Sequence, residues 1–435
     1  MPENRRLTAY QRGELIVPVI LRQHVAEAAF LYATRAALTR APHMKLHHLR
    51  RFDERLAGHL DGLSIAGKHA QSLCAEALES PSADAVFVAA VLAVMSRQRE
   101  DLDKLLALVE AAPAISKGLT AALGWVEPTS LQGIVASLLG SENPFRQSVG
   151  ITACALHRVD PGFATGRWTQ HSDPVVRARA LRAAGELGRV EFVSALPSAL
   201  HDPDPLCRLW AAWSAVLLGN RQNALDFLGH ATLEAGPLQE RALQLALQAL
   251  SIADGQVVLS RYASDPAQQR TVVRGAGFIG DPAHIPWLIS LMSDDRLARL
   301  AGEVFSFITG TDLAELDLER TPPETVAAGP NDDPDNPHVE LDEDEGLPWP
   351  DPVLVQSWWA QNQGRFTTGI RHFAGSPVTR EQCLYVLQNG YQRQRIAASL
   401  HLCLLHPGTP LFEWRAPAPR QLHAVAHIPG LKDAG

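Results

Sequence analysis

DPVVRARALRAAGELGR, residues 173–189, and DPLCRLWAAWSAVLLGN, residues 204–220, decide the fold of this chain. Each stretch opens with Asp-Pro, places an arginine three residues after the proline, and continues with alanine, leucine and valine at helical spacing. An Asp before a helix accepts bonds from its free N–H groups, and proline is tolerated at the first helical position. Each stretch therefore predicts a helix that begins at its proline and ends near Gly188 or Gly219.

The same pattern recurs at a nearly constant interval through the middle of the chain. The prolines that open it are separated by 30, 31, 32 and 29 residues, and they are Pro144, Pro174, Pro205, Pro237 and Pro266. A second, shorter amphipathic stretch follows each of them, such as QNALDFLGHATLEA at 222–235. A fixed period of this size marks a repeat protein whose two-helix units bury their apolar faces against their neighbours.

These units resemble HEAT repeats, and the resemblance covers about residues 115–310. The fold class that we predict is all-α: an α-solenoid of HEAT-like helical repeats with N- and C-terminal helical caps, and without a sheet. Because an arginine recurs at a similar offset from each proline, we expect Arg177 and Arg208 to bond to acidic or carbonyl groups of neighbouring repeats. The alternative is that these arginines form a ligand surface.

Changes in composition divide the chain into four parts. We predict an N-terminal helical domain or degenerate repeats at 1–115, HEAT-like repeats at 116–310, an acidic Pro-rich disordered insert at 311–350, and a C-terminal helical cap with an extended tail at 351–435. Residues 318–346 combine prolines with charge of one sign and few apolar side chains, a composition typical of disorder. We therefore expect them to be mobile and open to protease.

Length, apolar runs and cysteine usage point to a reduced compartment. The 435 residues contain no apolar run longer than AVFVAAVLAVM at 85–95, which is too short to span a bilayer, and no secretion signal is recognisable at the N-terminus. The five cysteines are scattered without the spacing of metal ligands. We expect a cytoplasmic protein without membrane insertion, and no cofactor is indicated.

The formal net charge of −8 is unevenly distributed. Residues 311–352 carry −13, residues 353–435 carry +5, and the rest of the chain is close to neutral. No part shows the large basic excess of a nucleic-acid-binding surface, so we expect no nucleic acid as partner. Because unlike charges attract, we expect the acidic segment to cover the positive C-terminal region until a partner displaces it.

The last fifth of the chain is dense in tryptophan and arginine, the residues that dominate binding hot spots. This density makes the region a candidate site for a protein partner, although the same tryptophans would also suit the core of a small closing domain. The partner-binding candidates are Trp349, Trp358, Trp359, Arg371, Arg393, Arg395, Trp414 and Arg415.

A second group of polar residues lies in two helical stretches near the N-terminus. His24, Asp53, Arg55 and His59 are set among apolar residues, and we interpret them as an ion-pair lattice between two helices rather than an acid–base site. His43 and His47 are four residues apart, but no third ligand accompanies them, so we predict no metal site.

Two passages resemble an uncharacterised proteobacterial HEAT-repeat family. They are HVAEAAFLYATRAALTRAPH with LRRFDERLAGHLDGLSIAG, within 24–67, and LPWPDPVLVQSWW through LFEWRAPAPRQ, within 347–421. Members of that family are encoded near type VI secretion components and effectors, so the resemblance implies an accessory, adaptor or scaffold role there. It supplies no catalytic residues.

The function we predict is a non-catalytic protein-binding scaffold whose partner is a secretion component or effector. The partner would be held by the solenoid groove or by the C-terminal tryptophans and arginines. No nucleophile motif, phosphate loop or zinc spacing occurs in the sequence. The alternative is an enzyme on a HEAT-like scaffold, of the lyase or DNA-base glycosylase type, which would need a basic groove around a flipped base.

Overall fold

The structure, a computed structural model, describes residues 17–162, 166–231, 238–323 and 342–428. These residues form two compact units. Unit 1 takes residues up to 38, residues 47–161 and the short segment 415–418, whereas unit 2 takes residues 39–46, 162–414 and those from 419 onward. Each unit is described by itself below.

Unit 1 consists of helices packed around one core. They are α2 (Pro18–Leu38), α3 (Leu46–Ala66), α4 (Lys68–Ala77), α5 (Ala83–Met95), α6 (Arg99–Ala111), η1 (Pro113–Ile115), α7 (Ser116–Trp125), η2 (Pro128–Leu131), α8 (Ile134–Leu139) and α9 (Pro144–Leu156).

The core of unit 1 is continuous from α2 to α9. Leu31, Phe87, Leu119 and Ala153 belong to a single buried cluster, in which α5 is covered along almost its whole length. The expected domain boundary near residue 115 therefore falls inside a core. The apolar run at 85–95 is the central helix of this core and owes its composition to burial.

Unit 2 contains most of the repeats and the C-terminal region. Its helices and strands are α10 (Pro174–Glu186), η4 (Val190–Phe192), α11 (Leu196–Ala199), α12 (Pro205–Leu217), α13 (Gln222–Ala231), α14 (Gln239–Ala249), α15 (Ile252–Ser260), η5 (Pro266–Gln268), α16 (Gln269–Ile279), η6 (Pro282–His284), α17 (Ile285–Leu291), α18 (Ala298–Thr309), α19 (Pro352–Asn362), η7 (Gln363–Arg365), β1 (His372–Phe373), β2 (Ser376–Pro377), α20 (Arg380–Asn389), α21 (Gln392–Leu405) and α22 (Ala418–Ala426).

The repeat helices start where the sequence predicts. Asp173 Oδ1 accepts from the N–H of Val175 at 2.8 Å, and Asp204 Oδ1 accepts from the N–H of Cys207 at 2.8 Å. Each carboxylate satisfies an N–H that has no partner inside its own helix. Pro237, the fourth proline of the series, lies outside the described residues.

Successive first helices of the repeats pack directly on one another. Helix α12 contacts α10, and the hydroxyl of Ser214 on α12 donates to the carbonyl of Leu181 on α10 at 2.7 Å. Alanines at both helix surfaces permit this approach, among them Ala180 and Ala211, which are fully buried. The small residues of the repeat pattern therefore serve close helix stacking.

The second helices are less regular than the sequence indicates. Residues 190–202, VEFVSALPSALHD, are one of the second amphipathic stretches of the predicted two-helix units, but they give the turn η4 and the four-residue α11. Pro197 explains the difference, because proline is accepted in the first turn of a helix but not in its interior. The predicted two-helix unit is thus correct in kind and too long at this position.

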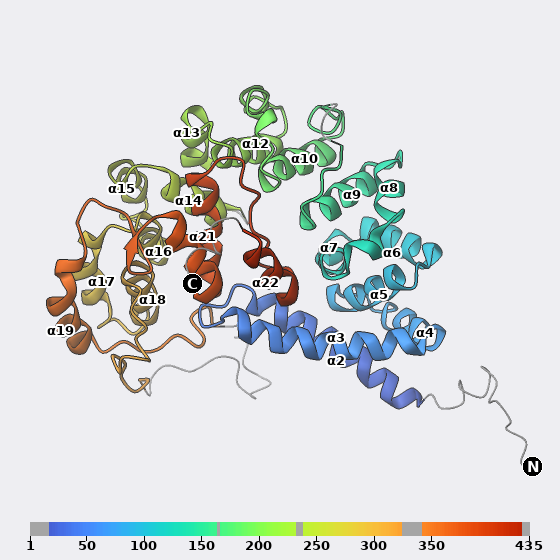
Figure 1. Cartoon of the computed structure of the whole chain (residues 1–435), viewed down its shortest axis with the longest axis horizontal. Coiled ribbons are helices and arrows are strands. Elements are labelled where there is room, and N and C mark those ends of the chain that lie inside the picture. The colour runs from blue at the N-terminus through green and yellow to red at the C-terminus, as the bar shows by residue number, and fades with distance from the viewer. Residues whose placement is uncertain (1–16, 163–165, 232–237, 324–341, 429–435) are drawn as a thin grey trace, which may run out of the picture. The chain divides into compact units, whose positions relative to one another are not determined.

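The C-terminal region runs back along the repeats instead of ending beside the last of them. Helix α19 packs on α17, strand β1 contacts α18, and α21 contacts α14 and α12 (Figure 1). Beyond α21 the N–H of Leu411 donates to the carbonyl of Glu186 at the end of α10 at 3.0 Å. This region is therefore part of the core of unit 2 along its length, as well as its C-terminal end.

A two-residue hairpin departs from the prediction of a fold without sheet. Strands β1 and β2 pair antiparallel, and both residues between them have positive φ, 48° at Ala374 and 95° at Gly375. Such a turn matches the twist of paired strands. The N–H of Ala374 donates to the carbonyl of Phe307 at 2.7 Å, so the hairpin satisfies carbonyls at the end of α18.

Glycines at the ends of repeat helices make room for the returning chain. Gly310 has φ 71°, and a Cβ at this position would lie 2.6 Å from the backbone of Ala374. Gly188 has φ 67°, and its Cβ would lie 2.3 Å from the carbonyl oxygen of Gly408. The glycines that end the helices in the sequence pattern are therefore also the places where the C-terminal region docks.

No single helix in the described part of the chain is long and apolar enough to cross a membrane, although one sharply bent pair, Arg99–Ala111 with Pro113–Trp125, passes by length and composition.

Candidate functional site

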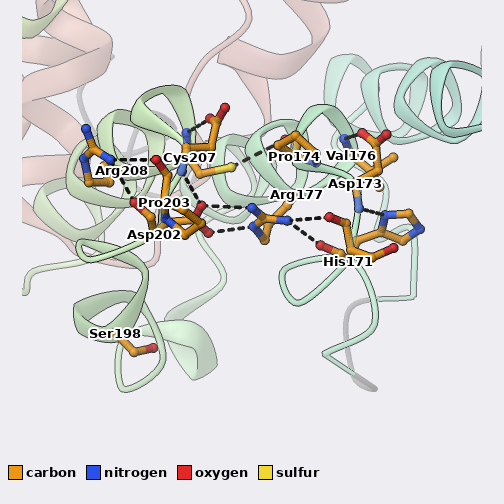
Figure 2. A network of polar contacts seen from close by, with 12 residues as sticks. His171, Asp173, Pro174, Val176, Arg177, Ser198, Asp202, Pro203, Cys207 and Arg208 are labelled. Carbon is orange, nitrogen blue, oxygen red and sulfur yellow. Dashed lines mark hydrogen bonds and ion pairs between the residues drawn. The ribbon is translucent and has the colours of Figure 1, made fainter.

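The arginines of the repeat pattern hold the turns between repeats together (Figure 2). Arg177 donates from Nε and Nη2 to the two carboxylate oxygens of Asp202, at 2.6 and 2.9 Å. Its Nη1 donates to the carbonyls of His171 at 2.6 Å and Ser172 at 3.1 Å. One guanidinium thus joins the turn before α10 to the turn before α12.

Arg208 repeats part of this arrangement one unit later. Its Nη1 donates to the backbone carbonyls of Asp202 at 2.8 Å and Pro203 at 3.1 Å. The hydrogen bond from Arg177 holds the pKa of the Asp202 carboxyl below its ordinary value, in spite of partial burial. These contacts confirm the predicted bonds of Arg177 and Arg208 to acidic or carbonyl groups at the turns between repeats.

None of the eight C-terminal candidates is exposed. Three of the four candidate tryptophans pack into the core. Trp349 and Trp359 are buried, and the ring of Trp358 lies 5.6 Å from that of Phe305. Within the described residues the sequence density of tryptophan therefore reflects the core of a region without long helices. This was one of the two interpretations that the sequence left open.

Arg371 caps the ends of two repeat helices. Its Nε donates to the carbonyl of Ile279 on α16 at 2.9 Å, and its Nη2 donates to Leu247 on α14 and Leu250, both at 2.8 Å. Its Nη1 donates to the carbonyl of Gln248. A cation at helix C-termini satisfies carbonyls that have no partner in their helices. Burial lowers the pKa of Arg371 to about 10.

Arg395 is fully buried, which corrects its assignment as a partner-binding residue. Its Nε donates to the carbonyl of Leu387 at 2.7 Å, its Nη2 to Gln421 Oε1 at 2.7 Å, and its Nη1 to Gln392. Burial lowers the pKa of Arg395 to about 10. A guanidinium enclosed in this way ties α20, α21 and α22 together and cannot reach a partner.

The last three candidates are half-buried. In unit 1 the backbone carbonyl of Arg415 accepts from Arg35 Nη1 at 3.0 Å. In unit 2 the carbonyl of Trp414 accepts from Gln421 at 2.8 Å. Arg393 donates to Glu303 at 2.7 Å and to the backbone carbonyl of Glu343 at 2.8 Å. Of the eight, Arg393 alone joins a surface cluster of charges, described below.

The polar cluster of unit 1 separates into two pairs. His24 and His59 approach each other, with 2.9 Å between their Nδ1 atoms, and burial together with His24 lowers the pKa of His59. Asp53 instead forms a buried ion pair with Arg35 and accepts from the N–H of Ala418 at 2.6 Å. Arg55 is exposed. The four residues thus do not converge on one acid–base centre.

The two histidines considered for a metal do not form a ligand set. His43 Nδ1 lies 2.9 Å from the carbonyl oxygen of Glu345, whereas the ring of His47 makes an edge contact with that of His48. In the described ranges no group of three or more His, Cys, Asp or Glu side chains is placed to hold a metal ion.

Unit 2 carries a charged surface that the sequence did not reveal. Four arginines from three helices contribute to it, and we call them the arginine surface: Arg270 and Arg274 on α16, Arg299 on α18, and Arg393 at the start of α21. Residues 342–345, which we call the acidic strip, lie against it.

Each acidic side chain of the strip's first three residues forms an ion pair of 2.7 Å or less with an arginine. Asp342 pairs with Arg299 at 2.6 Å, and Glu343 pairs with Arg274 at 2.6 Å. Asp344, which is buried, pairs with Arg270 at 2.7 Å. From the segment charges we expected the acidic segment to lie against residues 353–435. Of the four arginines that contact the acidic strip, however, three lie in the repeats.

The missed residues had a weak signal in the sequence. Arg270 and Arg274 lie one helical turn apart within residues 116–310, whose net charge is near zero, and a segment average conceals such a local cluster. The predicted mobile segment at 318–346 falls mainly on 324–341, which lie outside the described residues. Its described ends are paired, as the bridge between Glu319 and Pro350 shows.

Comparison with known proteins supports the repeat assignment. A family model described as HEAT repeats matches residues 167–251, which span α10 to α14 and include the Arg177–Asp202 junction. No curated protein and no solved structure matches the chain. The match and the stacked helices together confirm the predicted fold class: the chain carries HEAT repeats in an all-α solenoid.

Proposed function

We propose that this protein is a non-catalytic, protein-binding scaffold. HEAT repeats generally serve as protein-interaction scaffolds, and the matched model lies in the centre of unit 2. One observation on this chain carries the proposal. Polar side chains of the repeats bond to the repeats themselves, as Arg177 and Arg208 do, while apolar side chains remain exposed along the same helices.

The exposed apolar residues recur in the repeat pattern. Val175 and Leu206 both follow the proline that opens a first helix, and they are 56% and 43% exposed. On second helices, Val257 is 59% and Trp287 is 37% exposed. Exposed apolar side chains that follow one structural period offer a partner a repeated set of contacts, which is how solenoids bind extended surfaces.

The finer assignment concerns the partner and the compartment. We propose a cytoplasmic adaptor that is accessory to type VI secretion or its effectors. The support is the resemblance of residues 24–67 and 347–421 to the family encoded near such components. The five cysteines are free and buried, which agrees with a reducing compartment, and burial raises the pKa of Cys74, Cys207 and Cys383 to about 12.

Affinity capture from the native host, read by quantitative mass spectrometry, tests the scaffold. The variant Val257→Lys with Trp287→Lys should reduce the captured partner at least about 10-fold, because two apolar contacts are replaced by charges. The matched control is Ile65→Lys in unit 1, where an 88% exposed apolar residue outside the matched repeats is changed. Equal capture by both variants would contradict the proposed surface. In a separate assay, release of damaged bases from DNA by the protein would favour the glycosylase instead.

A further inference from the structure

The acidic strip binds the arginine surface as a turn, in which the N–H of Glu345 donates to the carbonyl of Asp342 at 3.1 Å and that of Leu347 to the carbonyl of Asp344 at 3.0 Å. Besides the three ion pairs, its backbone is recognised: the carbonyl of Glu343 accepts from Arg393 at 2.8 Å, and that of Asp344 accepts from Arg299 Nη1 at 3.1 Å. His43 Nδ1 lies 2.9 Å from the carbonyl oxygen of Glu345. The side chains of residues 342–344 and the backbone carbonyls of residues 343–345 are therefore bound together.

An aromatic anchor follows the acidic residues. Trp349 is buried, with the guanidinium of Arg299 over its ring at 4.8 Å and that of Arg320 at 5.6 Å. Gly346, with φ 75°, turns the chain between the acidic strip and this ring. Arg299 contacts both parts, since it pairs with Asp342 and stacks on Trp349. The recognised pattern is thus three acidic residues followed, five positions after the last, by an aromatic ring.

The bound segment is an addition to the repeats and not one of their helices. The N–H of Arg320 donates to the carbonyl of Trp349 at 2.7 Å, and the N–H of Asp351 donates to the carbonyl of Leu318 at 2.9 Å. These two bonds close the base of the insertion. The arginines therefore belong to the scaffold, while the acidic strip belongs to an insertion between α18 and α19.

Part of the site remains open to further bonding. Glu343 is 62% exposed although it contacts both Arg274 and Arg270. The Nε of Arg299 is buried and has no hydrogen-bond partner within the described residues. A buried guanidinium N–H without an acceptor is costly, so an additional ligand oxygen at this point would be favourable.

We propose that the arginine surface is a recognition site for an acidic–aromatic peptide of a protein partner, and that residues 342–349 are its resident occupant. The inference rests on the proposed scaffold function and names the chemistry of the partner. A partner segment binds by replacing the resident carboxylates on Arg270, Arg274 and Arg299 and, with its own aromatic residue, the ring of Trp349.

A peptide fits this surface better than a nucleic acid does. Glu303 lies among the arginines, paired with Arg393 at 2.7 Å, and Glu240 lies 3.9 Å from Arg274. A continuous phosphate backbone would meet these carboxylates, whereas a peptide can place neutral residues opposite them. Recognition of successive backbone carbonyls also favours a peptide, because each carbonyl accepts a hydrogen bond without adding charge.

The resident segment is an intramolecular competitor and must be weakened before binding is measured. A tethered segment acts at an effective concentration of roughly millimolar, which a peptide at micromolar concentration does not overcome. The test variant is the full chain with Asp342→Asn, Glu343→Gln and Asp344→Asn, which keeps the shape of the strip and removes three of its four charges. Far-UV circular dichroism and thermal melting establish that it is folded.

The probe is a fluorescein-labelled synthetic peptide with the sequence of residues 342–349, DEDEGLPW, and the readout is fluorescence anisotropy. We expect the triple variant to bind it at least about 10-fold more tightly than the unchanged chain, because the competitor is weakened. Adding Arg274→Gln to the triple variant should remove about 10-fold of that affinity, since a charge-assisted bond is lost. A control peptide, NQNQGLPW, should bind at least about 10-fold more weakly.

Three results would overturn the inference. The triple variant binds DEDEGLPW no better than the unchanged chain, or the control peptide binds equally, or a single-stranded oligonucleotide of equal charge binds as tightly as the peptide. If the triple variant is unfolded, Glu343→Gln alone decides: this exposed change should improve peptide binding about 3-fold, and no improvement refutes the inference. Because the probe is synthetic, these outcomes are independent of partner capture by Val257 and Trp287.

Discussion

The repeat junction around Arg177 and the arginine surface around Arg274 use the same two side-chain types for different ends. At the junction, Arg177 and Asp202 are 14% and 9% exposed, and both partners belong to the repeats. At the surface, Arg274 and Glu343 are 22% and 62% exposed, and the carboxylate arrives from an insertion 69 residues away. An ion pair fixed within the repeat period supports the fold, whereas one supplied by an insertion can be exchanged.

Arginine position within a repeat does not by itself distinguish the two uses. Arg177 and Arg208 follow their prolines by three residues, and Arg270 follows Pro266 by four. Arg270 also keeps a junction contact, since its Nη1 donates to the carbonyl of Arg296 at 3.2 Å. Its Nη2 is the atom that turns to Asp344 at 2.7 Å. What differs is the partner of the carboxylate in the next turn: Asp202 pairs with Arg177, whereas Asp295, also 25 residues after its arginine, pairs with Arg320 at 2.8 Å.

The largest effect is expected for Arg177→Met. It removes two bonds to Asp202 and two to backbone carbonyls and leaves a nearly buried carboxylate without its cation. We expect a loss of about 2–3 kcal/mol in the free energy of unfolding, less than for a fully buried pair. The melting temperature should fall by about 5–10 °C, as measured by differential scanning calorimetry.

The matched control for this change is Arg274→Met at the arginine surface. Its partner Glu343 is mostly exposed, and exposed ion pairs contribute about 0–1 kcal/mol. If both variants lose the same stability, the distinction between a structural junction and an exchangeable surface is wrong.

Acid should weaken the junction through Asp202. Because Arg177 holds the pKa of this carboxyl below its unfolded value of 3.8, the stabilisation is fully present above that value and is lost as pH falls through the folded pKa. We expect Asp202→Asn to be less stable at pH 7 by about 1–2 kcal/mol. Its urea midpoint should then change less than that of the unchanged chain between about pH 5 and pH 3.

The pH profile separates this pair from the other carboxylates. All carboxylates titrate in both proteins, so the difference between the two urea curves reports Asp202 alone. Parallel curves from about pH 5 downward would show that Asp202 is not linked to stability through its charge.

Arg208→Met should cost less than Arg177→Met. The guanidinium of Arg208 donates to the carbonyls of Asp202 and Pro203, and among the described residues no carboxylate forms an ion pair with it. Hydrogen bonds from a charged donor contribute more than neutral ones, and we expect a loss of about 1–2 kcal/mol. Chemical denaturation of the two variants measures the difference, and a loss equal to that of Arg177→Met would assign the effect to the carbonyls alone.

Glu343→Gln is expected to change stability least. Burial acts to raise the pKa of Glu343, but the hydrogen bond with Arg274 and the nearby arginines outweigh it and hold the pKa below its ordinary value. With the carboxylate mostly exposed, its pairing contributes less than about 0.5 kcal/mol. The melting temperature should stay within about 1 °C while binding of the acidic peptide increases, and a large loss of stability would place the acidic strip among the structural elements.

The sequence by itself determined the features that depend on neighbouring residues. Helix starts at Pro174 and Pro205 follow from Asx-Pro capping, which is satisfied within three residues of chain. The period of about 30 residues predicts the stacked two-helix units, and the recurring arginine predicts the junction contacts. These features are local, so a pattern in the chain is sufficient to specify them.

Only the tertiary structure decided which surfaces far apart in sequence would meet. Arg371 and Arg395 looked like binding residues because arginine is common at interfaces, yet one caps α14 and α16 and the other is enclosed among α20, α21 and α22. A guanidinium can satisfy backbone carbonyls as well as it can meet a partner, and composition does not distinguish these uses. The acidic strip likewise lies on the repeats and on Arg393, because ion pairing depends on local geometry and not on the net charge of a segment.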